Sequence, residues 1–171
     1  MIVFALSVKN MSYSAHRGKK EFSVILDLLK RYCAFQERTS ADVELKGMKE
    51  GLGREEIENA LETLKEQGFL DENRYVTAFV SGKLNHNKWG KNKIRAELKS
   101  KRMNEELIAD ALELIDDVHY EEVLKTLLKK KAVTFQGLRD EDTKVKLLRY
   151  ALSKGFEYEK VFIMVNEILK A

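Results

Sequence analysis

Apolar residues between positions 71 and 115 recur at intervals of three and four, which is the spacing of one face of an α-helix. The stretch contains three such patterns in succession, and none of the three helices can bury its apolar stripe alone. The sequence therefore predicts helices that pack against one another. Their apolar positions are Tyr75, Phe79, Val80 and Leu84; Ile94 and Leu98; and Leu107, Ile108, Ala111, Leu112 and Ile115.

This pattern occurs three times along the chain. When Leu52, Met103 and Phe156, which are 51 and 53 residues apart, are aligned, small or apolar residues come into register on both sides. Six matched positions in three copies favour a true repeat over the alternative, a single irregular bundle whose spacing is a by-product of amphipathic helices. The matched positions are Val43, Ile94 and Leu147; Gly47, Leu98 and Ala151; Ile57, Ile108 and Val161; Ala60, Ala111 and Met164; Leu61, Leu112 and Val165; and Leu64, Ile115 and Ile168.

Each copy predicts a module of three helices and about fifty residues. The expected fold class is therefore all-α, with three tandem three-helix repeats. Because stacked repeats contact only their neighbours, the array is expected to be elongated. The first helices of the modules are expected at Glu21–Tyr32, Glu72–Leu84 and about His119–Lys131. The predicted boundaries are an amino-terminal tail at 1–19, repeat 1 at 20–70, repeat 2 at 71–117 and repeat 3 at 118–171.

The turn between the second and third helix of each repeat has its own signal. Gly51 and Gly155 come just before the aligned positions, as expected for a helix that ends in the left-handed conformation. Arg102 occupies this position in the middle repeat, so the turn there is expected either to hold a left-handed arginine or to take another geometry. Asn104 is the best N-cap of the three helices that follow. Further expected caps are Thr39 or Ser40, and Asp140 or Asp142.

Composition agrees with a helical protein. The chain has no proline and only nine glycines among 171 residues, so we expect no sheet. Hydrophobic residues make up 44% of the chain, and the single cysteine, Cys33, cannot form an internal disulfide. The apolar opening MIVFALS is too short for a secretory signal or for a membrane span, which needs roughly 20 apolar residues. We therefore expect a soluble protein of the cytoplasm.

Charge is sorted along the chain. Residues 83–102 carry eight Lys or Arg against one acid, Glu97, whereas residues 103–124 carry eight Asp or Glu and no Lys or Arg. A solvated helix face is the ordinary explanation, but the uncompensated self-repulsion favours a helix that meets an acidic partner, either a protein groove or a phosphate backbone. The only tryptophan, Trp89, is expected either to contact that partner or to fill the gap between the first and second helices. The candidate residues are Lys83, Lys88, Trp89, Lys91, Lys93, Arg95, Lys99, Lys101 and Arg102.

A second basic group lies in the third repeat and is a weaker candidate, because Asp140, Glu141 and Asp142 partly neutralise it. The net charge is only +3, so any contact with nucleic acid should be local. The histidines are few and widely separated, and neither a glycine-rich phosphate loop nor a nucleophile elbow stands out. We therefore expect no metal site, no cofactor and no enzymatic activity. The second group consists of Lys129, Lys130, Lys131, Lys144, Lys146 and Arg149, with Arg139 between its halves.

The middle repeat carries a motif of an Asp, an aromatic residue four positions later, an aromatic and aliphatic pair, a basic-x-Gly turn, an Ile, a Glu-Leu pair and a basic turn. Its residues are Asp71, Tyr75, Phe79, Val80, Lys88, Gly90, Ile94, Glu97, Leu98 and Lys101. The third repeat adds Tyr150, Leu152, Gly155, Phe156, Tyr158 and Val161. Over about residues 20–170 the chain thus resembles the RecX family, bacterial modulators of the RecA recombinase. Arg102 departs from the family, which usually has glycine there.

The resemblance implies a curved crescent of repeats that lodges in the groove of the RecA filament on single-stranded DNA. There it would inhibit the recombinase, ATPase and coprotease activities of RecA, and so affect DNA repair and the SOS response. RecA protein is then the expected partner, and single-stranded DNA is a further candidate. The alternative is a free-standing helical module that binds nucleic acid without RecA, and the small net charge favours the first function. We expect a monomer.

Overall fold

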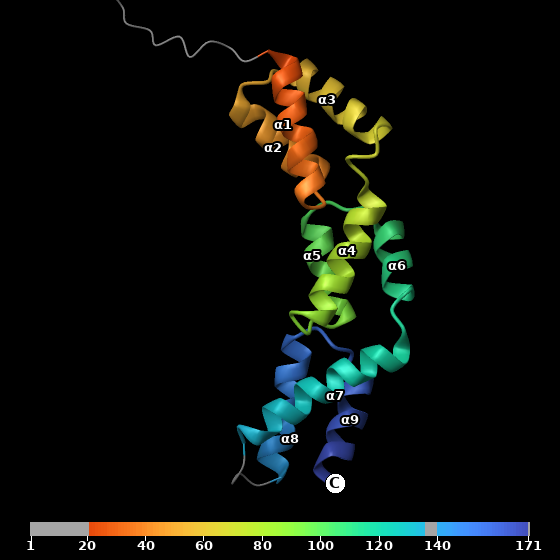
Figure 1. The fold of residues 1–171 in the computed structure, drawn as a ribbon. Coiled ribbons are helices and arrows are strands. Elements are labelled where there is room, and N and C mark those ends of the chain that lie inside the picture. Colours follow the sequence, from red (N-terminus) through yellow and green to blue (C-terminus); the bar gives the residue numbers. More distant parts are fainter. Residues whose placement is uncertain (1–20, 136–139, 171) are drawn as a thin grey trace, which may run out of the picture.

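The computed structural model describes residues 21–135 and 140–170. Within these ranges the chain forms nine helices and no strand, which confirms the all-α prediction, while the predicted tail at 1–19 lies outside them. Figure 1 shows the helices stacked along one long axis into an elongated, curved array. The helices are α1 (Phe22–Phe35), α2 (Ser40–Glu50), α3 (Arg54–Glu66), α4 (Glu72–Asn85), α5 (Lys91–Ser100), α6 (Glu105–Glu113), α7 (Asp117–Val133), α8 (Asp140–Ser153) and α9 (Tyr158–Lys170).

The curved array has an inner and an outer side. Figure 1 shows α2, α5 and α8 along the inner side of the curve, and α3, α6 and α9 along the outer side. The second helix of each predicted repeat therefore faces inward. No helix among the described residues is long and apolar enough to cross a membrane.

The three turns between inner and outer helices share one geometry. The backbone φ angles of Gly51, Arg102 and Gly155 are 99°, 60° and 87°, all in the left-handed region. Glycine adopts this conformation freely, whereas another residue pays roughly 1–2 kcal/mol. Of the two geometries expected at position 102, the left-handed arginine is the one observed. The next residue in each turn donates its N–H to a carbonyl five positions back, in the pairs Leu52 to Gly47, Met103 to Leu98 and Phe156 to Ala151.

Two of the expected helix caps are also present. The Asn104 side chain accepts a hydrogen bond from the N–H of Glu106 at 2.7 Å, at the start of α6. Thr39 and Asp42 cap α2 reciprocally, because each side chain accepts from the backbone N–H of the other residue. The local signals of the sequence therefore place these helix starts correctly.

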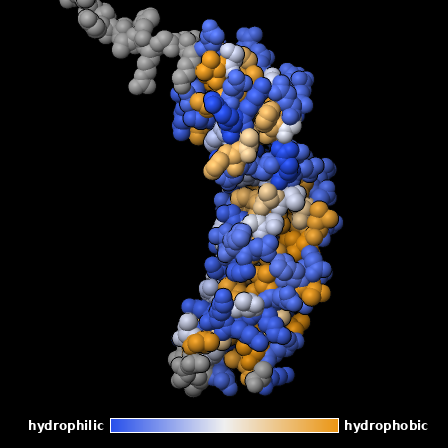
Figure 2. Space-filling model, in the orientation of Figure 1, coloured by the Kyte–Doolittle hydropathy of each residue, from blue (hydrophilic) through white to orange (hydrophobic). Residues whose placement is uncertain are grey.

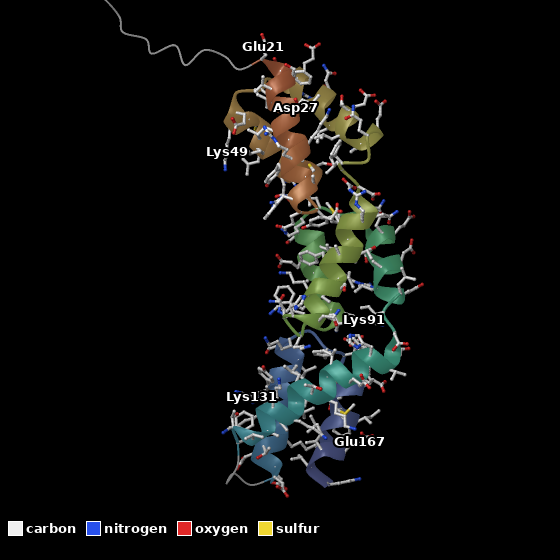
Figure 3. All side chains as sticks on the ribbon, viewed as in Figure 1. Glu21, Asp27, Lys49, Lys91, Lys131 and Glu167 are labelled. Carbon is white, nitrogen blue, oxygen red and sulfur yellow. The ribbon has the colours of Figure 1, made fainter. Side chains whose placement is uncertain are left out.

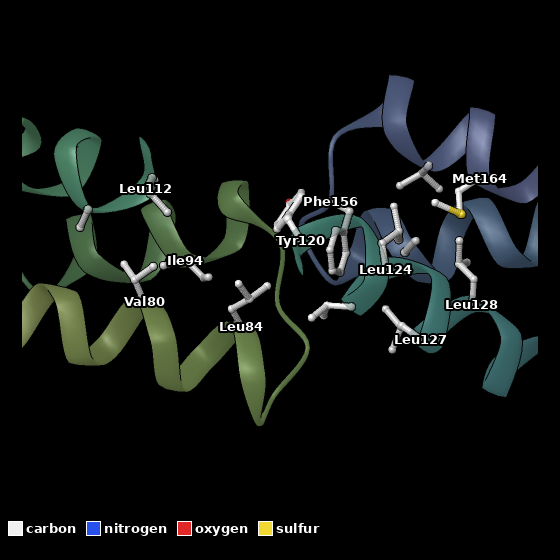
Figure 4. Close-up of a cluster of buried hydrophobic side chains, with 14 of the residues drawn as sticks. Val80, Leu84, Ile94, Leu112, Tyr120, Leu124, Leu127, Leu128, Phe156 and Met164 are labelled. Atoms are coloured by element: carbon white, nitrogen blue, oxygen red, sulfur yellow. The ribbon is translucent and has the colours of Figure 1, made fainter. Parts of the chain in front are cut away.

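The apolar side chains form two separate cores. The smaller core lies among α1, α2 and α3 and includes Ile25, Leu29, Val43 and Leu64. The larger core runs without a break through α4 to α9, and Figure 4 shows it passing from Val80, Leu84, Ile94 and Leu112 to Tyr120, Phe156 and Leu124. The boundaries predicted for the second and third repeats remain a prediction, since the two share this core.

A backbone contact joins α5 to the turn after α8. The N–H of Gly90 donates to the carbonyl of Lys154 at 2.8 Å, and the N–H of Asn92 donates to the carbonyl of Gly155 at 3.1 Å. The amino-terminal end of α5 is thus capped by the carboxyl-terminal end of α8. A Cβ atom on Gly90 would lie 2.3 Å from the Gly155 carbonyl oxygen, so only glycine fits. We call this contact the second joint, because it lies between the predicted second and third repeats.

The buried phenol of Tyr120 reinforces the second joint. Its hydroxyl donates to Glu157 Oε2 at 2.6 Å and accepts from the N–H of Lys91 at 3.0 Å. Burial raises the pKa of Tyr120 well above its ordinary value, and the hydrogen bond to Glu157 raises it further. The raised pKa favours the neutral phenol, which keeps its hydroxyl as a donor to Glu157.

Replacing Gly90 with alanine tests the second joint. We expect Gly90→Ala to lower the free energy of unfolding by about 1–3 kcal/mol, because the new methyl group meets backbone atoms that cannot move aside separately. The matched control is Gly82→Ala in α4, where no atom lies within 4 Å of the added Cβ. That variant should gain about 0.5–1 kcal/mol from helix propensity. Urea unfolding measures both, and equal stabilities for the two variants would contradict the close packing.

Candidate interaction surface

The structure brings the nine residues of the first candidate group onto neighbouring elements. None of the nine is buried, and Arg95, Lys99 and Arg102 are exposed. Figure 2 shows a mainly hydrophilic inner edge in this view, whereas strongly hydrophobic side chains gather over α6 on the outer side. Lys83 lies in the last turn of α4, Lys88 and Trp89 lie in the following loop, Lys91, Lys93, Arg95 and Lys99 lie on α5, and Lys101 and Arg102 lie in the turn after it.

The ring of Trp89 packs against the larger core, and the ammonium groups of two lysines lie over it. The Nζ atoms of Lys83 and Lys93 lie 4.8 Å and 4.7 Å from the centroid of its ring. Lys83 also lies 5.0 Å from the ring of Phe79. These cation–π contacts hold both ammonium groups near the surface. The half-buried ring packs against the larger core. Both expectations for Trp89, a filled gap between two helices and a contact with a partner, stay predictions.

Acids from the next helix neutralise part of the basic stretch. Glu105, at the start of α6, lies 3.5 Å from Arg95 and 3.0 Å from Lys99. Lys91 lies 3.9 Å from Asp117. The acid-rich segment therefore folds back beside the basic one, which relieves some of the self-repulsion inferred from the sequence. Because these ion pairs are largely exposed, each contributes little to stability.

Five cations of the first group have no acidic partner among the described residues, and two of them, Lys83 and Lys93, stack on Trp89. Lys88, Lys101 and Arg102 make no ion pair there, and Lys88 and Arg102 both have positive φ angles, 54° and 60°. Lys88 and Lys101 are half-buried and Arg102 is exposed. These residues keep their full charge for a partner. The periodicity of the sequence could not separate them from the paired residues, because the pairing acids lie in other helices.

Lysines of the second group stack on aromatic rings. Lys131 lies 5.1 Å from the ring of Phe135 and 5.2 Å from that of Tyr150, and Lys146 lies 5.4 Å from Phe135. Lys154, which the sequence did not single out, lies 5.9 Å from Tyr150. Figure 3 shows Lys131 on α7 and Lys91 beside the second joint.

The remaining members of the second group do not all share this environment. Lys144 stacks on Phe162, on α9, at 4.7 Å. Lys129, Lys130 and Arg149 are exposed, and Arg139 lies outside the described residues. The second group is therefore spread over several surfaces.

The first basic group reaches the end of α8 at the second joint. Lys93 Nζ donates to the carbonyl of Ser153 at 3.4 Å, at the end of α8, directly before Lys154. Charged and aromatic side chains thus continue from α4 and α5 to α7 and α8. Among the described residues no three His, Cys, Asp or Glu side chains are grouped as metal ligands would be. Such a surface suits an extended acidic partner.

Comparison with known proteins identifies the class of this array. The family model described as RecX, second three-helix domain, matches residues 71–112. The crystal structure of RecX from Lactobacillus salivarius aligns with a TM-score of 0.76 over 85% of this chain and 95% of that chain, at 23% identity. A crystal structure of a regulatory protein RecX aligns with a TM-score of 0.75 over 85% of this chain and 71% of that chain, at 24% identity. The fold is therefore that of RecX three-helix repeat proteins.

Curated relatives agree with this class. The regulatory protein RecX of Clostridium botulinum strain Eklund 17B is 33% identical over 134 residues, which cover 77% of this chain and 62% of the relative. The chain thus spans less than two thirds of that relative's length. The regulatory protein RecX of Chlorobaculum tepidum is 29% identical over 152 residues, which cover 89% of this chain and 91% of the relative. In sequence and in fold the chain is therefore similar to proteins of the RecX family.

Removing the shared acid tests the ion pairs of α5. We expect Glu105→Gln to change the free energy of unfolding by less than about 1 kcal/mol, because Arg95 and Lys99 are solvent-exposed partners. The same variant should bind a heparin column more tightly, since two cations lose their counter-charge. Glu113→Gln, with the same change of charge at the other end of α6, is the matched control. Equal elution of the two variants would show that these pairs do not limit the basic surface.

Proposed function

We propose that this protein is a regulatory protein that binds the RecA filament on single-stranded DNA and lowers its recombinase, ATPase and coprotease activities. One observation carries the proposal. The family model of the second RecX domain covers residues 71–112, and this range contains every residue of the first basic group. On this proposal the protein works in the cytoplasm as a monomer, without a cofactor and without catalysis, and affects DNA repair and the SOS response.

The curved shape supports binding along a helical groove. An elongated, curved array can follow an acidic surface over its whole length, and each three-helix group adds contacts. Arg95 is suited to a carboxylate of the filament because its planar guanidinium can bind two oxygens at once. In the free protein it lies beside Glu105, so binding would exchange one carboxylate for another.

A second candidate function is direct binding of single-stranded nucleic acid by a free-standing module. The lysine and aromatic contacts of α4, α5, α7 and α8 favour it, because such surfaces follow a phosphate backbone and offer rings to bases. The small net charge of +3 argues that this affinity is weak without a filament.

The decisive experiment is RecA ATPase on single-stranded DNA, with RecA from the same source, titrated with this protein. We expect the rate to fall at substoichiometric to near-stoichiometric ratios. The double variant Lys91→Glu, Arg95→Glu should lose inhibition. The control Lys125→Glu, Lys170→Glu makes the same charge change at exposed positions on α7 and α9 and should keep it. An unchanged ATPase across the titration with folded wild-type protein would rule the function out.

Binding to bare single strands at two salt concentrations separates the two candidate functions. If four cations of α5 contact phosphates, log affinity should fall with log salt at a slope of roughly −3, from about −0.7 for each contact. The double variant would then lose affinity for bare DNA and for the filament in equal proportion. We expect it to lose filament binding while its weak affinity for bare DNA changes little.

A further inference from the structure

A groove opens where the first three helices meet α4 and α5, and we call this place the first joint. It encloses about 520 Å³ and lies between the loop after α1 and the inner faces of α4 and α5. Tyr75 and Phe79 are stacked along one wall, with ring centroids 5.9 Å apart. The groove lies outside the two basic groups except where Lys83 and Lys101 reach it.

The repeat explains why the first joint is open and the second is closed. Thr39 stands at the repeat position of Gly90, and Arg102 stands at that of Gly155. The N–H of Thr39 donates to Asp42 in its own helix, at 3.1 Å, whereas Gly90 donates across the second joint. No backbone hydrogen bond between described residues crosses the first joint. The groove is thus the counterpart of a place that main-chain atoms fill in the other joint.

Tyrosines at equivalent positions show the same contrast. Tyr75 and Tyr120 each stand four residues after an Asp that caps the helix, at the starts of α4 and α7. The Tyr120 hydroxyl bonds to Glu157 and to the Lys91 N–H across the second joint. The Tyr75 hydroxyl makes no hydrogen bond to a described residue, and its ring lines the groove. Tyr75 therefore has a hydroxyl to offer to an occupant.

The wall formed by the loop after α1 holds two buried polar atoms without a protein partner. These are Glu37 Oε2, an acceptor, and Arg38 Nε, a donor. The other Glu37 oxygen lies 2.6 Å from Arg74 Nε, and the Arg38 guanidinium stacks on Tyr32 at 4.0 Å, so both side chains are held in place. An unpaired donor and an unpaired acceptor on consecutive residues are complementary to an extended peptide backbone, which presents a C=O and an N–H in alternation.

Charge in the groove favours an acidic occupant. Arg38, Lys83 and Lys101 line it and pair with no acid among the described residues. Of the acids that line it, Glu37 is paired with Arg74 and Asp42 caps α2. Because capping does not remove the charge of Asp42, Asp42 and Glu97 then oppose three cations.

We propose that the groove of the first joint binds an extended, acidic segment of a protein partner, with its backbone on Glu37 and Arg38 and its carboxylates near Lys83 and Lys101. An apolar side chain of the segment lies on the rings of Tyr75 and Phe79. The inference deepens the proposed function by naming one place where a protein partner docks, and it rests on that function only for the identity of the partner. Occupancy would fix the first three helices against the rest of the array.

Fluorescence of Trp89 provides the test. Lys83 lines the groove and lies 4.8 Å from the ring of this only tryptophan, so an acid that draws Lys83 away changes the emission. The probe is a capped pentapeptide in which glutamates alternate with leucines, added to the full chain. We expect saturable binding, and about tenfold weaker binding when glutamines replace the glutamates. No saturable change up to the solubility limit of the peptide would overturn the proposal.

Variants assign the binding to the groove. Arg38→Gln and Lys101→Gln should each weaken peptide binding about tenfold, and Lys101→Gln keeps the test valid if Arg38→Gln fails to fold. Lys125→Gln, an exposed position on α7, should bind as wild type, and an equal loss there would overturn the assignment. Sedimentation checks for a second copy as occupant, since a dimer abolished by Lys101→Gln would also overturn it. The peptide assay contains no RecA, so its failure and a failed ATPase inhibition are separate results.

Discussion

The arrangement of α4 to α9 depends on the backbone contact between Gly90 and the turn at Gly155. The N-cap residue Gly90 has no side chain to cap α5, so the first N–H groups need acceptors from elsewhere. Two carbonyls in the turn after α8 supply them at 2.8 Å and 3.1 Å, and the Tyr120 hydroxyl supplies a third acceptor. The two helices meet end to end with their dipoles aligned, which stabilises both ends. Because the backbones touch, the apolar residues on either side merge into one core instead of two.

The first joint follows the opposite rule at equivalent positions. Thr39 caps its own helix through Asp42, so α2 needs no carbonyl from its neighbour, and the two three-helix groups meet through side chains. Ser40 donates to Glu72 at 3.0 Å, and Arg74 pairs with Glu37. A self-sufficient helix start thus leaves the first core separate. The residues at these positions therefore differ between the joint where neighbouring groups share a core and the joint where they do not.

Local sequence patterns predict most of the fold but little of how the surface side chains are arranged. Helix positions, the left-handed turns and the Asn104 cap follow from spacing within about ten residues, and a sequence shows such spacing directly. The pairing of Glu105 with Arg95 and Lys99, and the stacking of Lys93 on Trp89, depend on how helices pack. The role of Gly90 was hidden for the same reason, since its restriction comes from Gly155, far along the chain.

The state of each cation before binding determines what it can contribute. A free lysine loses about 1.5–2 kcal/mol of side-chain entropy when a partner fixes it. Lys83, Lys93 and Lys131 are already held against rings, so part of that loss has occurred on folding. Arg95 and Lys99 would instead exchange their ion pairs with Glu105 for ion pairs with a partner carboxylate. Each would then contribute only the difference in free energy between the two ion pairs. If the proposed function holds, the stacked lysines would supply affinity more efficiently than the exposed pairs, although sequence alone gives all of them the same charge.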